Sequence, residues 1–362
     1  MRIIFFIGTV DLLLSAIGYF YYRNNLPWGH NPAFGLAYLL LTANAIVSRA
    51  LSPSLPHMLV KISAWLDGLW LAFGYYTLLL ALIHLVLWLI SRLGGWQLPS
   101  MKMSVVGLAA ICLFIAWGSH RAFHPTVRTE RIITDKLASG QSYKMVLLTD
   151  IHLGRILGRS YAERLAARIN ELQPDAVLIA GDLVDEKIAY VQEENSLAAL
   201  SSIHAPKGVY VSFGNHEYID NPDLWQRMLE QQNFTVLRDA DAIVDGKIKI
   251  TGLTDFSRNR SNRTLEDLAA KNVSYYNILL DHQPRKMAAA AETAYDLYLS
   301  GHTHTGQLFP NRLITKKMYQ LDYGRCEYNG LTAITSAGYG FWGPPVRTEA
   351  APEIVVIEVT GK

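Results

Sequence analysis

The sequence predicts a protein of two parts, an all-α membrane domain over residues 1–120 followed by an α/β domain over residues 121–362. Three observations predict this fold class. The chain of 362 residues is long enough for two domains of ordinary size. Only eight of its 64 charged residues lie in residues 1–120. From residue 121 onward, short apolar runs alternate with helical patterns, which is typical of an α/β fold.

Four apolar runs in the first third reach or approach the length of a membrane helix, which needs about 20 apolar residues to cross the hydrocarbon core. They cover residues 3–22, 34–47, 69–90 and 103–118. We therefore expect about four transmembrane helices. A cleaved signal peptide would explain only the first run. Buried helices of a soluble protein are the other alternative, and the scarcity of charge argues against them.

The distribution of Lys and Arg near the helix ends indicates the orientation of the chain. An even number of spans places the N-terminus and the α/β domain on the same side. That side carries Arg2, Arg49, Lys61, Arg121 and Arg128, and the other carries Arg23, Arg92 and Lys102. The excess favours an integral protein of the inner or plasma membrane with a cytoplasmic α/β domain.

Three ionisable residues, Asp11, Asp67 and His84, lie within the predicted helices. Intramembrane ionisable groups are candidates for function. The alternative is structural: the acids lie near helix ends or pair between helices, and His84 makes one interhelical hydrogen bond.

Strands are predicted in the α/β domain where short runs are apolar or alternate in polarity. In chain order they lie at residues 126–133, 145–149, 176–180, 209–213, 275–280, 295–300, 331–335 and 354–359. A turn-rich linker over residues 136–142 precedes the second strand. The dipeptide Asp245-Gly246 predicts a hairpin over residues 242–251.

Helices are predicted where apolar residues recur with the helical period. They lie at residues 161–172, 188–203 and 222–232, and an Ala-rich segment covers residues 286–292 between two of the strands. Ser160 and Glu163 have the spacing of a capping box at the start of the first helix, and Pro222 suits the first position of the third. We expect these elements to form one mixed sheet or two packed sheets.

Composition excludes several classes of protein. A hydrophobic content of 50% excludes a disordered chain. The net charge of +2 does not indicate nucleic acid as a partner. The two cysteines, Cys112 and Cys326, exclude a disulfide framework and lack the spacing of a cysteine metal site.

Polar side chains follow five of the predicted strands at the point where each strand ends. They are Asp150 and His152, Asp182, Asn215 and His216, His282, and His302 and His304. Each alone would be a turn former, a helix cap or an ordinary histidine. Ligands bind beyond the carboxyl ends of strands in open α/β sheets, so we expect the set to converge. His204 fits no strand end and is interpreted as structural.

Seven of these residues offer imidazole, carboxylate and amide ligands without a thiolate: Asp150, His152, Asp182, Asn215, His282, His302 and His304. Such ligands suit Zn, Mn, Fe or Ni. Seven are too many for one four-coordinate ion, but they fill two adjacent sites if one carboxylate bridges. Two ions about 3.5–4 Å apart are a known device for in-line displacement at phosphorus.

The ordered motifs resemble the calcineurin-like metallophosphoesterase family. They read Asp150-Ile-His152, Gly181-Asp182-Leu-Val-Asp185, Gly214-Asn215-His216-Glu217, His282 and Gly301-His302-Thr-His304. The resemblance covers about residues 121–360 and implies a four-layer αββα sandwich with the site on loops above the sheets. The Gly-rich segment 336–347 before the last strand is similar to the membrane-anchored bacterial branch of this family.

The resemblance also assigns roles by motif position. It implies that one metal ion is held by Asp150, His152 and His304, the second by Asn215, His282 and His302, and that Asp182 bridges them. His216 would stand over the substrate and donate a proton to the leaving oxygen. A hydroxide bridging the two ions would be the nucleophile.

Several further residues have two interpretations. Asp185 either accepts a hydrogen bond that fixes the site or caps a helix. Arg155 either steadies a phosphate or is a solvated loop residue, and Arg347 is a candidate for contact with substrate. The aromatic residues Tyr339, Phe341 and Trp342 either meet the membrane or a lipid-like substrate, or pack in the core.

These features predict a membrane-tethered phosphoesterase with two divalent ions, of Mn, Fe or Zn. Its substrate would be a phosphate ester or a pyrophosphate, and resemblance to enzymes that cleave the pyrophosphate of a nucleotide-linked lipid sugar favours a lipid-linked one. The alternative is a membrane-anchored metal-binding receptor or scaffold without turnover. Transport is disfavoured because the helices lack paired Gly/Pro interruptions. The sequence leaves the oligomeric state open.

Overall fold

The chain divides into two units, described separately here. One unit comprises Met1–His120 with Gly343–Thr348, and the other comprises Arg121–Trp342 with Glu349–Lys362. The structure is a computed structural model that describes residues 2–51, 55–185, 187–258, 264–268 and 274–362, with side chains described for residues 8–44 and for all the later ranges.

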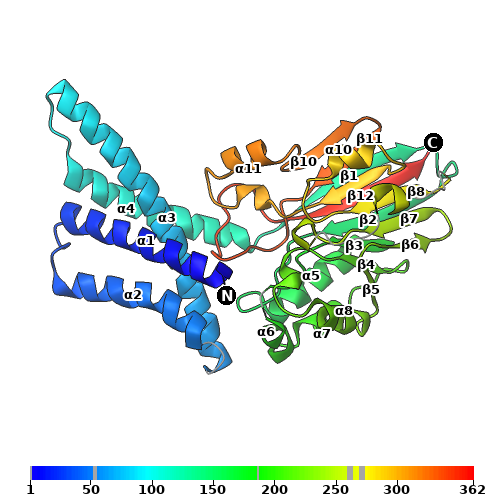
Figure 1. The fold of residues 1–362 in the computed structure, drawn as a ribbon, viewed down its shortest axis with the longest axis horizontal. Coiled ribbons are helices and arrows are strands. Elements are labelled where there is room, and N and C mark those ends of the chain that lie inside the picture. Colours follow the sequence, from blue (N-terminus) through cyan, green and yellow to red (C-terminus); the bar gives the residue numbers. More distant parts are fainter. Residues whose placement is uncertain (1, 52–54, 186, 259–263, 269–273) are drawn as a thin grey trace. The chain divides into compact units, whose positions relative to one another are not determined.

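The described residues of the first unit form four helices (Figure 1). They are α1 (Arg2–Asn25), α2 (Pro32–Leu51), α3 (His57–Gly94) and α4 (Ser100–Ala122). Among the described residues, α3 and α4 are long and apolar enough to cross a membrane, and α2 contains a shorter apolar stretch over Pro32–Asn44. The sequence predicted four spans, of which these two are shown as candidates. Residues 3–7 and 45–47 of the first two predicted runs lie outside the described side chains.

His84 of α3 joins three of these helices through its imidazole. Its Nδ1 lies 3.1 Å from the hydroxyl of Tyr21 on α1, and its Nε2 lies 2.9 Å from Oγ of Ser100 on α4. Ser104 of α4 donates to the same Tyr21 hydroxyl at 2.9 Å. His84 therefore makes two interhelical hydrogen bonds where one was expected, and it holds polar groups that hydrocarbon would otherwise leave unsatisfied.

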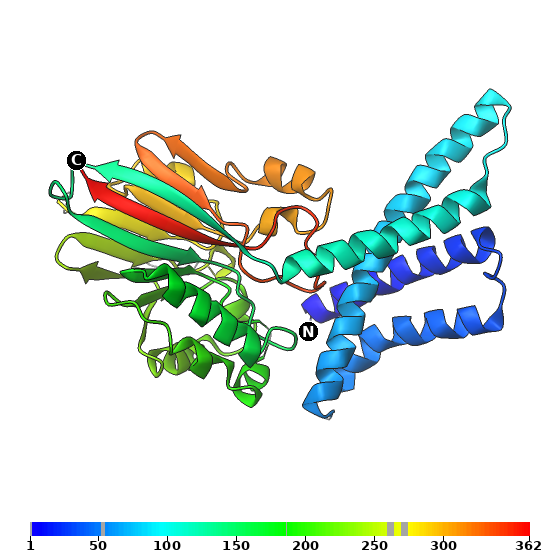
Figure 2. The ribbon, with the colours of Figure 1, turned by 180° about the vertical axis from the view of Figure 1, so that it is seen from behind.

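Two six-stranded sheets form the core of the second unit (Figures 1 and 2). The first has the order β1-β12-β2-β3-β4-β5, with bounds β1 (Thr126–Thr134), β12 (Glu353–Gly361), β2 (Ser142–Leu148), β3 (Ala176–Ala180), β4 (Val209–Ser212) and β5 (Phe234–Leu237). The second has the order β10-β11-β9-β8-β7-β6, with bounds β10 (Gly324–Tyr328), β11 (Leu331–Thr335), β9 (Leu297–Ser300), β8 (Tyr276–Leu280), β7 (Ile248–Gly252) and β6 (Ala240–Val244).

Within each sheet the central strands run parallel. In the first sheet β2, β3, β4 and β5 are parallel neighbours, and in the second β7, β8, β9 and β11 are parallel neighbours. β6 and β7 pair antiparallel across Asp245-Gly246, as the hairpin motif predicted. The parallel arrangement brings the carboxyl ends of several strands to one edge of each sheet.

Alternation along the strands gives each sheet two buried faces. Met145 and Leu147 of β2 pack in the layer between the sheets, whereas Val146 and Leu148 pack outward. The outward face of the first sheet is covered by α5 (Arg159–Leu172), α6 (Ile188–Glu193), α7 (Ser196–Leu200) and α8 (Pro222–Glu230). The second sheet is covered by α9 (Leu265–Leu268) and α10 (Met287–Ala291). The order is helices, sheet, sheet, helices, which is the predicted αββα sandwich.

Two local predictions about helices were wrong. The expected helix over residues 188–203 is broken into α6 and α7 at Asn195, whose φ of 52° is left-handed. The N-cap of α5 is Gly158 and not Ser160. The Glu194 carboxylate accepts the Arg159 N–H there at 2.8 Å, so a neighbouring helix satisfies the donor that a capping box would have satisfied.

Candidate metal centre

The loops after β2 and β3 carry the first two acidic residues of the site. The Asp150 N–H donates to the Gly181 carbonyl at 3.0 Å, and the His152 N–H donates to the Asp182 carbonyl at 3.0 Å. These two bonds extend the pairing of β2 and β3 beyond the ends of the strands. The Asp150 and Asp182 side chains are thereby fixed at the same edge of the sheet, and both are buried.

The second sheet contributes its residues at the same place. His302 follows β9, and its N–H donates to Asp150 Oδ2 at 3.0 Å. The carbonyl of His282, which follows β8, accepts the Gly301 N–H at 3.0 Å. The carboxyl ends of strands from both sheets therefore meet, as the sequence predicted.

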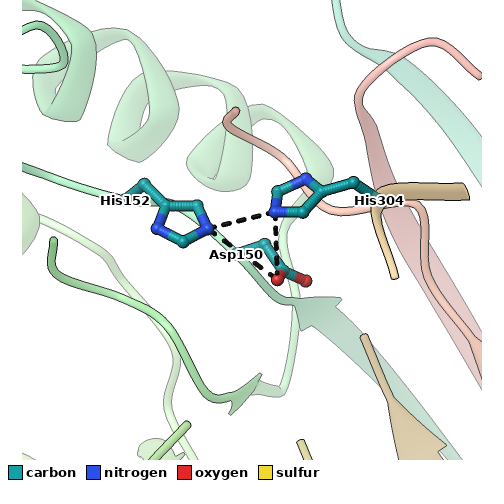
Figure 3. Close-up of side chains that lie close together, drawn as sticks. All are labelled: Asp150, His152 and His304. Carbon is teal, nitrogen blue, oxygen red and sulfur yellow. Dashed lines mark hydrogen bonds and ion pairs between the residues drawn. The ribbon is translucent and has the colours of Figure 1, made fainter. Parts of the chain in front are cut away.

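One cluster consists of Asp150, His152 and His304, whose side chains point toward one another (Figure 3). The Nε2 atoms of His152 and His304 are 3.1 Å apart. Asp150 Oδ1 lies 3.4 Å from His304 Nε2 and 3.9 Å from His152 Nε2. Two imidazole nitrogens and a carboxylate oxygen facing one small space are an arrangement that suits a divalent ion.

A second cluster consists of Asp182, His282 and His302. His282 Nε2 lies 3.0 Å from Asp182 Oδ2, and His302 Nδ1 lies 3.3 Å from His282 Nε2. His282 Nδ1 is 2.9 Å from the Ala180 carbonyl, which can only accept a hydrogen bond. Nδ1 therefore carries a proton, and Nε2 is the atom that faces the cluster.

Asp182 belongs to more than one group of ligands. Its Oδ2 is also 3.9 Å from His152 Nε2 and 3.8 Å from His216 Nε2. Asp182 thus lies between His152 of the first cluster and His282 of the second, and its role as a bridge stays a prediction.

Asn215 supplies the clearest test of whether a metal ion fits these residues. Its Oδ1 is buried and has no hydrogen-bond partner within the described part of the chain. A buried polar atom without a partner carries a desolvation penalty of about 1–3 kcal/mol. The next residue, His216, donates its N–H to Asp182 Oδ1 at 2.9 Å, so a cation held beside Asp182 could satisfy this atom, and a ligand role for Asn215 stays a prediction.

His216 and Asp185 form a pair beside the two clusters. His216 Nδ1 lies 2.6 Å from Asp185 Oδ1, which leaves Nε2 on the side of Asp182. Burial lowers the pKa of His216, but the negative charges of Asp182 and Asp185 outweigh burial and raise it to about 9. The imidazole is therefore protonated at neutral pH. Of the two interpretations of Asp185, the hydrogen bond to His216 is the one the structure shows.

The charges of the clustered groups follow from their neighbours. Burial disfavours the charged form of Asp182, but His282 and the other histidines hold its pKa well below the ordinary value. Burial and the nearby His282 lower the pKa of His302 to about 4. The carboxylate is therefore ionised and His302 is neutral near pH 7, and metal ligands need these forms.

Five of the seven predicted ligands have left-handed backbone. The φ values of Asp150, His152, Asp182, His302 and His304 lie between 47° and 69°. This region is costly for most residues, and Asn, Asp and His enter it more readily than others. Strained backbone of this kind gathers at functional sites.

Glu217 is a positioning residue that the sequence reasoning passed over. It is fully buried, and its carboxylate accepts N–H groups from Gly214 at 2.7 Å and from Asp182 and Val184 at 3.1 Å each. It ties the loop after β3 to the loop after β4. The signal in the sequence was an acid directly after Asn215-His216, to which the sequence reasoning assigned no role.

The Gly-rich loop after β11 packs directly behind Asp150. Tyr339 N–H donates to Thr149 O at 2.9 Å and Gly340 N–H donates to Asp150 O at 2.7 Å. A Cβ on Gly338, whose φ is 84°, would lie 2.8 Å from Asp150 Cβ. Glycine is required there because any side chain would displace the first acidic residue of the site.

The three aromatic residues of this loop have different fates. Tyr339 and Phe341 are buried in the core beside Tyr161 and Phe123. Trp342 is 40% exposed, and its ring lies 5.9 Å from that of His216. Core packing, one of the two interpretations, therefore holds for the first two, and Trp342 lies at the edge of the site.

The two arginines predicted near the substrate are placed differently. The Arg155 guanidinium lies 5.8 Å from the centre of the Tyr190 ring, and its charge helps to lower the pKa of Asp185. Arg347 lies in Gly343–Thr348, which groups with the helical unit, and its N–H donates to Gly118 O at 2.9 Å. A role for Arg347 at the substrate stays a prediction.

The fold and the site together define an α/β sandwich that gathers histidine, aspartate and asparagine ligands at its strand ends, which is the class of metal-dependent hydrolases. Residues 143–306 match the family model described as calcineurin-like phosphoesterase. The chain belongs to this family of metallophosphoesterases.

Relatives from distant organisms support this assignment. The chain is 34% identical over 244 residues to an uncharacterized metallophosphoesterase of Helicobacter pylori. The alignment covers 66% of this chain and 65% of that protein. The chain is 30% identical over 298 residues to one of Campylobacter jejuni, covering 81% of this chain and 77% of that protein. A transmembrane protein with metallophosphoesterase domain from Danio rerio is 29% identical over 276 residues, covering 71% of this chain and 63% of that protein. The chain thus spans just under two thirds of the length of the first and third of these relatives.

The position of Glu217 leads to a prediction about stability. In Glu217→Gln an amide NH₂ replaces one acceptor oxygen and opposes backbone donors, which should cost about 1–3 kcal/mol. We expect a lower midpoint of thermal unfolding and a lower metal content after dialysis. The control is Glu163→Gln, at an exposed position on α5. Unfolding at the wild-type midpoint would show that the carboxylate does not hold the two loops together.

Proposed function

We propose that the protein hydrolyses phosphate esters at a pair of divalent cations. The observation that carries this proposal is the position of Asp182 between two clusters of ligands, with the protonated His216 beside them. One centre alone would not need both clusters. The family supports phosphoester chemistry, and the pairing of the sites is our inference.

In this proposal one ion is held by Asp150, His152 and His304, the other by Asn215, His282 and His302, and Asp182 lies between them. When bound, the ions polarise the phosphoryl group and lower the pKa of the attacking water. Nitrogen and oxygen ligands of this kind suit Mn, Fe or Zn. The chain's own contribution is to hold the ligands at fixed distances on rigid strand ends.

His216 is proposed as the proton donor to the leaving oxygen. Asp185 keeps its Nδ1 protonated and fixes the orientation of the ring at 2.6 Å. Nε2 is then the atom that faces the substrate, and the proton on it passes to the departing oxygen. Burial lowers the pKa of His216, but the charge of Asp185 and its hydrogen bond to Nδ1 raise it, which favours the protonated donor.

We propose further that the substrate has a bulky leaving group, as a phosphodiester or a pyrophosphate can supply. Trp342 lies next to His216, where a departing group would be. Gln307 fixes this residue by donating from Nε2 to the Trp342 carbonyl at 2.9 Å and accepting its N–H at 3.2 Å. An indole at this point offers apolar contact to a bulky leaving group.

The metal pair is tested by the ion content and activity of the full chain. We expect two ions per chain and Mn²⁺-dependent hydrolysis of bis(para-nitrophenyl) phosphate. Asp182→Asn should hold fewer than two ions and lose activity to background. The control, Asp223→Asn, changes an exposed acid on α8. Two tightly held ions without hydrolysis of any simple ester would favour the receptor or scaffold alternative instead.

The proton donor is tested by changing the leaving group. His216→Asn should keep its metal content but slow the hydrolysis of an alkyl ester by about 10²–10⁴-fold. The effect should be much smaller for a para-nitrophenyl ester, which departs without protonation. His204→Asn, at an exposed position, serves as the control. An equal loss for both esters would contradict the role of general acid.

We also propose that the helical unit anchors the enzyme in the inner or plasma membrane with the phosphoesterase unit in the cytoplasm. The two apolar helices and the transmembrane relatives indicate membrane association. The side is inferred from the excess of Lys and Arg predicted on the side of residues 121–362.

Protease access tests this orientation. In intact spheroplasts residues 121–362 should resist external protease, and they should be cleaved once the membrane is permeabilised. A periplasmic marker protein should be digested in both samples. Cleavage in intact spheroplasts would place the phosphoesterase unit outside.

A further inference from the structure

A short amphipathic segment of the phosphoesterase unit exposes four large apolar residues within ten positions. Phe309 is 53% exposed, and on α11 (Arg312–Met318) Leu313, Ile314 and Met318 are 66%, 56% and 56% exposed. Contiguous exposed apolar residues usually mark a site of interaction, in contrast to those scattered singly.

Polar contacts on the other face of α11 fix its orientation. Arg312 and Thr315, three residues apart and so on one face, both donate to Asp322 Oδ2, at 3.3 Å and 3.0 Å. The Tyr319 hydroxyl next to the helix end lies 3.3 Å from Arg285 Nη2. The helix is held by this inner face, so its apolar side chains remain directed away from the unit.

The exposed charge on the segment comes from Lys316 and Lys317, because Arg312 is paired with Asp322 at 3.3 Å. Residues 305–321 contain Arg312, Lys316 and Lys317 and no acid. Both lysines are exposed, and Lys317 lies four residues after Leu313 on the outer face. Apolar side chains flanked by lysines are typical of helices that lie in the interface of an anionic bilayer, where the lysine stems follow the apolar surface and the amines meet the headgroups.

We propose that Phe309 and α11, called here the interfacial segment, seat in the headgroup region of an anionic membrane. Two observations indicate that an anionic bilayer, and not another protein, covers this segment: the positive charge of its lysines and the membrane-length helices of the same chain. A bilayer offers a negative surface over an apolar layer, and this chain carries two helices that are long and apolar enough to span one.

The interfacial segment is tied to the metal centre. Thr303, between His302 and His304, donates from Oγ1 to the Asp322 carbonyl at 2.6 Å, and Asp322 is the residue that holds α11. The Tyr319 ring lies 6.1 Å from the His302 ring. Docking of the segment would hold the ligand loop at the membrane surface. Resting on the proposed function, this assigns the substrate to phosphate esters carried by lipids.

The seating is tested with a fluorescent probe on the full chain in lipid nanodiscs. After replacement of Cys112 and Cys326 by serine, Ile314→Cys carries an environment-sensitive NBD label. The matched control is Ile243→Cys on β6. Ile243 is 54% exposed, and β6 is one edge strand of the second sheet, whereas β10 is the other. In phosphatidylcholine with phosphatidylglycerol, we expect blue-shifted emission and quenching by doxyl-labelled lipid at position 314 only.

Two results would overturn the seating. One is a label at position 314 that resembles the control. The other is a blue shift without quenching by doxyl lipid, which would indicate a protein partner or a second copy. Lys316→Glu with Lys317→Glu should reduce the quenching, and persistence of full quenching would exclude attraction to anionic lipid.

Activity then tests the assignment of the substrate. Ile314→Glu should lower hydrolysis of phosphatidyl-para-nitrophenol in the bilayer by about tenfold or more, since burial of one such side chain is worth about that factor. Hydrolysis of soluble bis(para-nitrophenyl) phosphate should not change. Equal effects on both substrates would contradict the assignment. The fluorescent label reports membrane contact whether or not the protein is an active enzyme. A failure of the phosphoesterase proposal is therefore distinguishable from a failure of the membrane-contact proposal.

Discussion

Face-to-face packing of the two sheets is the constraint on which the rest of the phosphoesterase unit depends. Leu178 of β3 and Ile278 of β8 belong to one continuous core between the sheets. Because this core aligns the sheets, the loop after β3 meets the loops after β8 and β9. Asp182 can then lie 3.0 Å from His282, although 100 positions separate them in the chain. A shift of one sheet against the other would separate the two halves of every cluster.

The sequence predicted that these histidines and aspartates gather in one place better than it predicted the elements around them. Residue types that bind metals stand directly after apolar runs. The same pattern therefore predicted both the strands and the polar residues at their ends. The strand β5 was missed because the exposed Thr235 interrupts its apolar run, and β10 was missed because it is a polar edge strand. The segment containing α11 had no buried face to produce a helical apolar pattern. Glu217 was missed because its partners are backbone N–H groups, which leave no pattern in the sequence.

The loop between β11 and β12 links several features that were first considered separately. Its glycines pack behind Asp150, its Tyr339 and Phe341 fill the core, and its Trp342 stands beside His216. The following segment, Gly343–Thr348, groups with the helical unit, where the Thr348 hydroxyl lies 2.6 Å from that of Tyr76. One short stretch of chain thus contributes to both units. Its unusual content of glycine and aromatic residues reflects these several demands.

The left-handed torsions at the ligand positions have a consequence for how ions come and go. Folding has already set the backbone of Asp150, Asp182 and His304 in a region that these residue types tolerate. The backbone that carries the ligands is therefore already in its binding conformation before an ion binds. It would keep that conformation when the ion is released. Loading would then be the binding of an ion from solution to a site whose backbone is already set. The ion that occupies it in a cell is set as much by supply as by the protein.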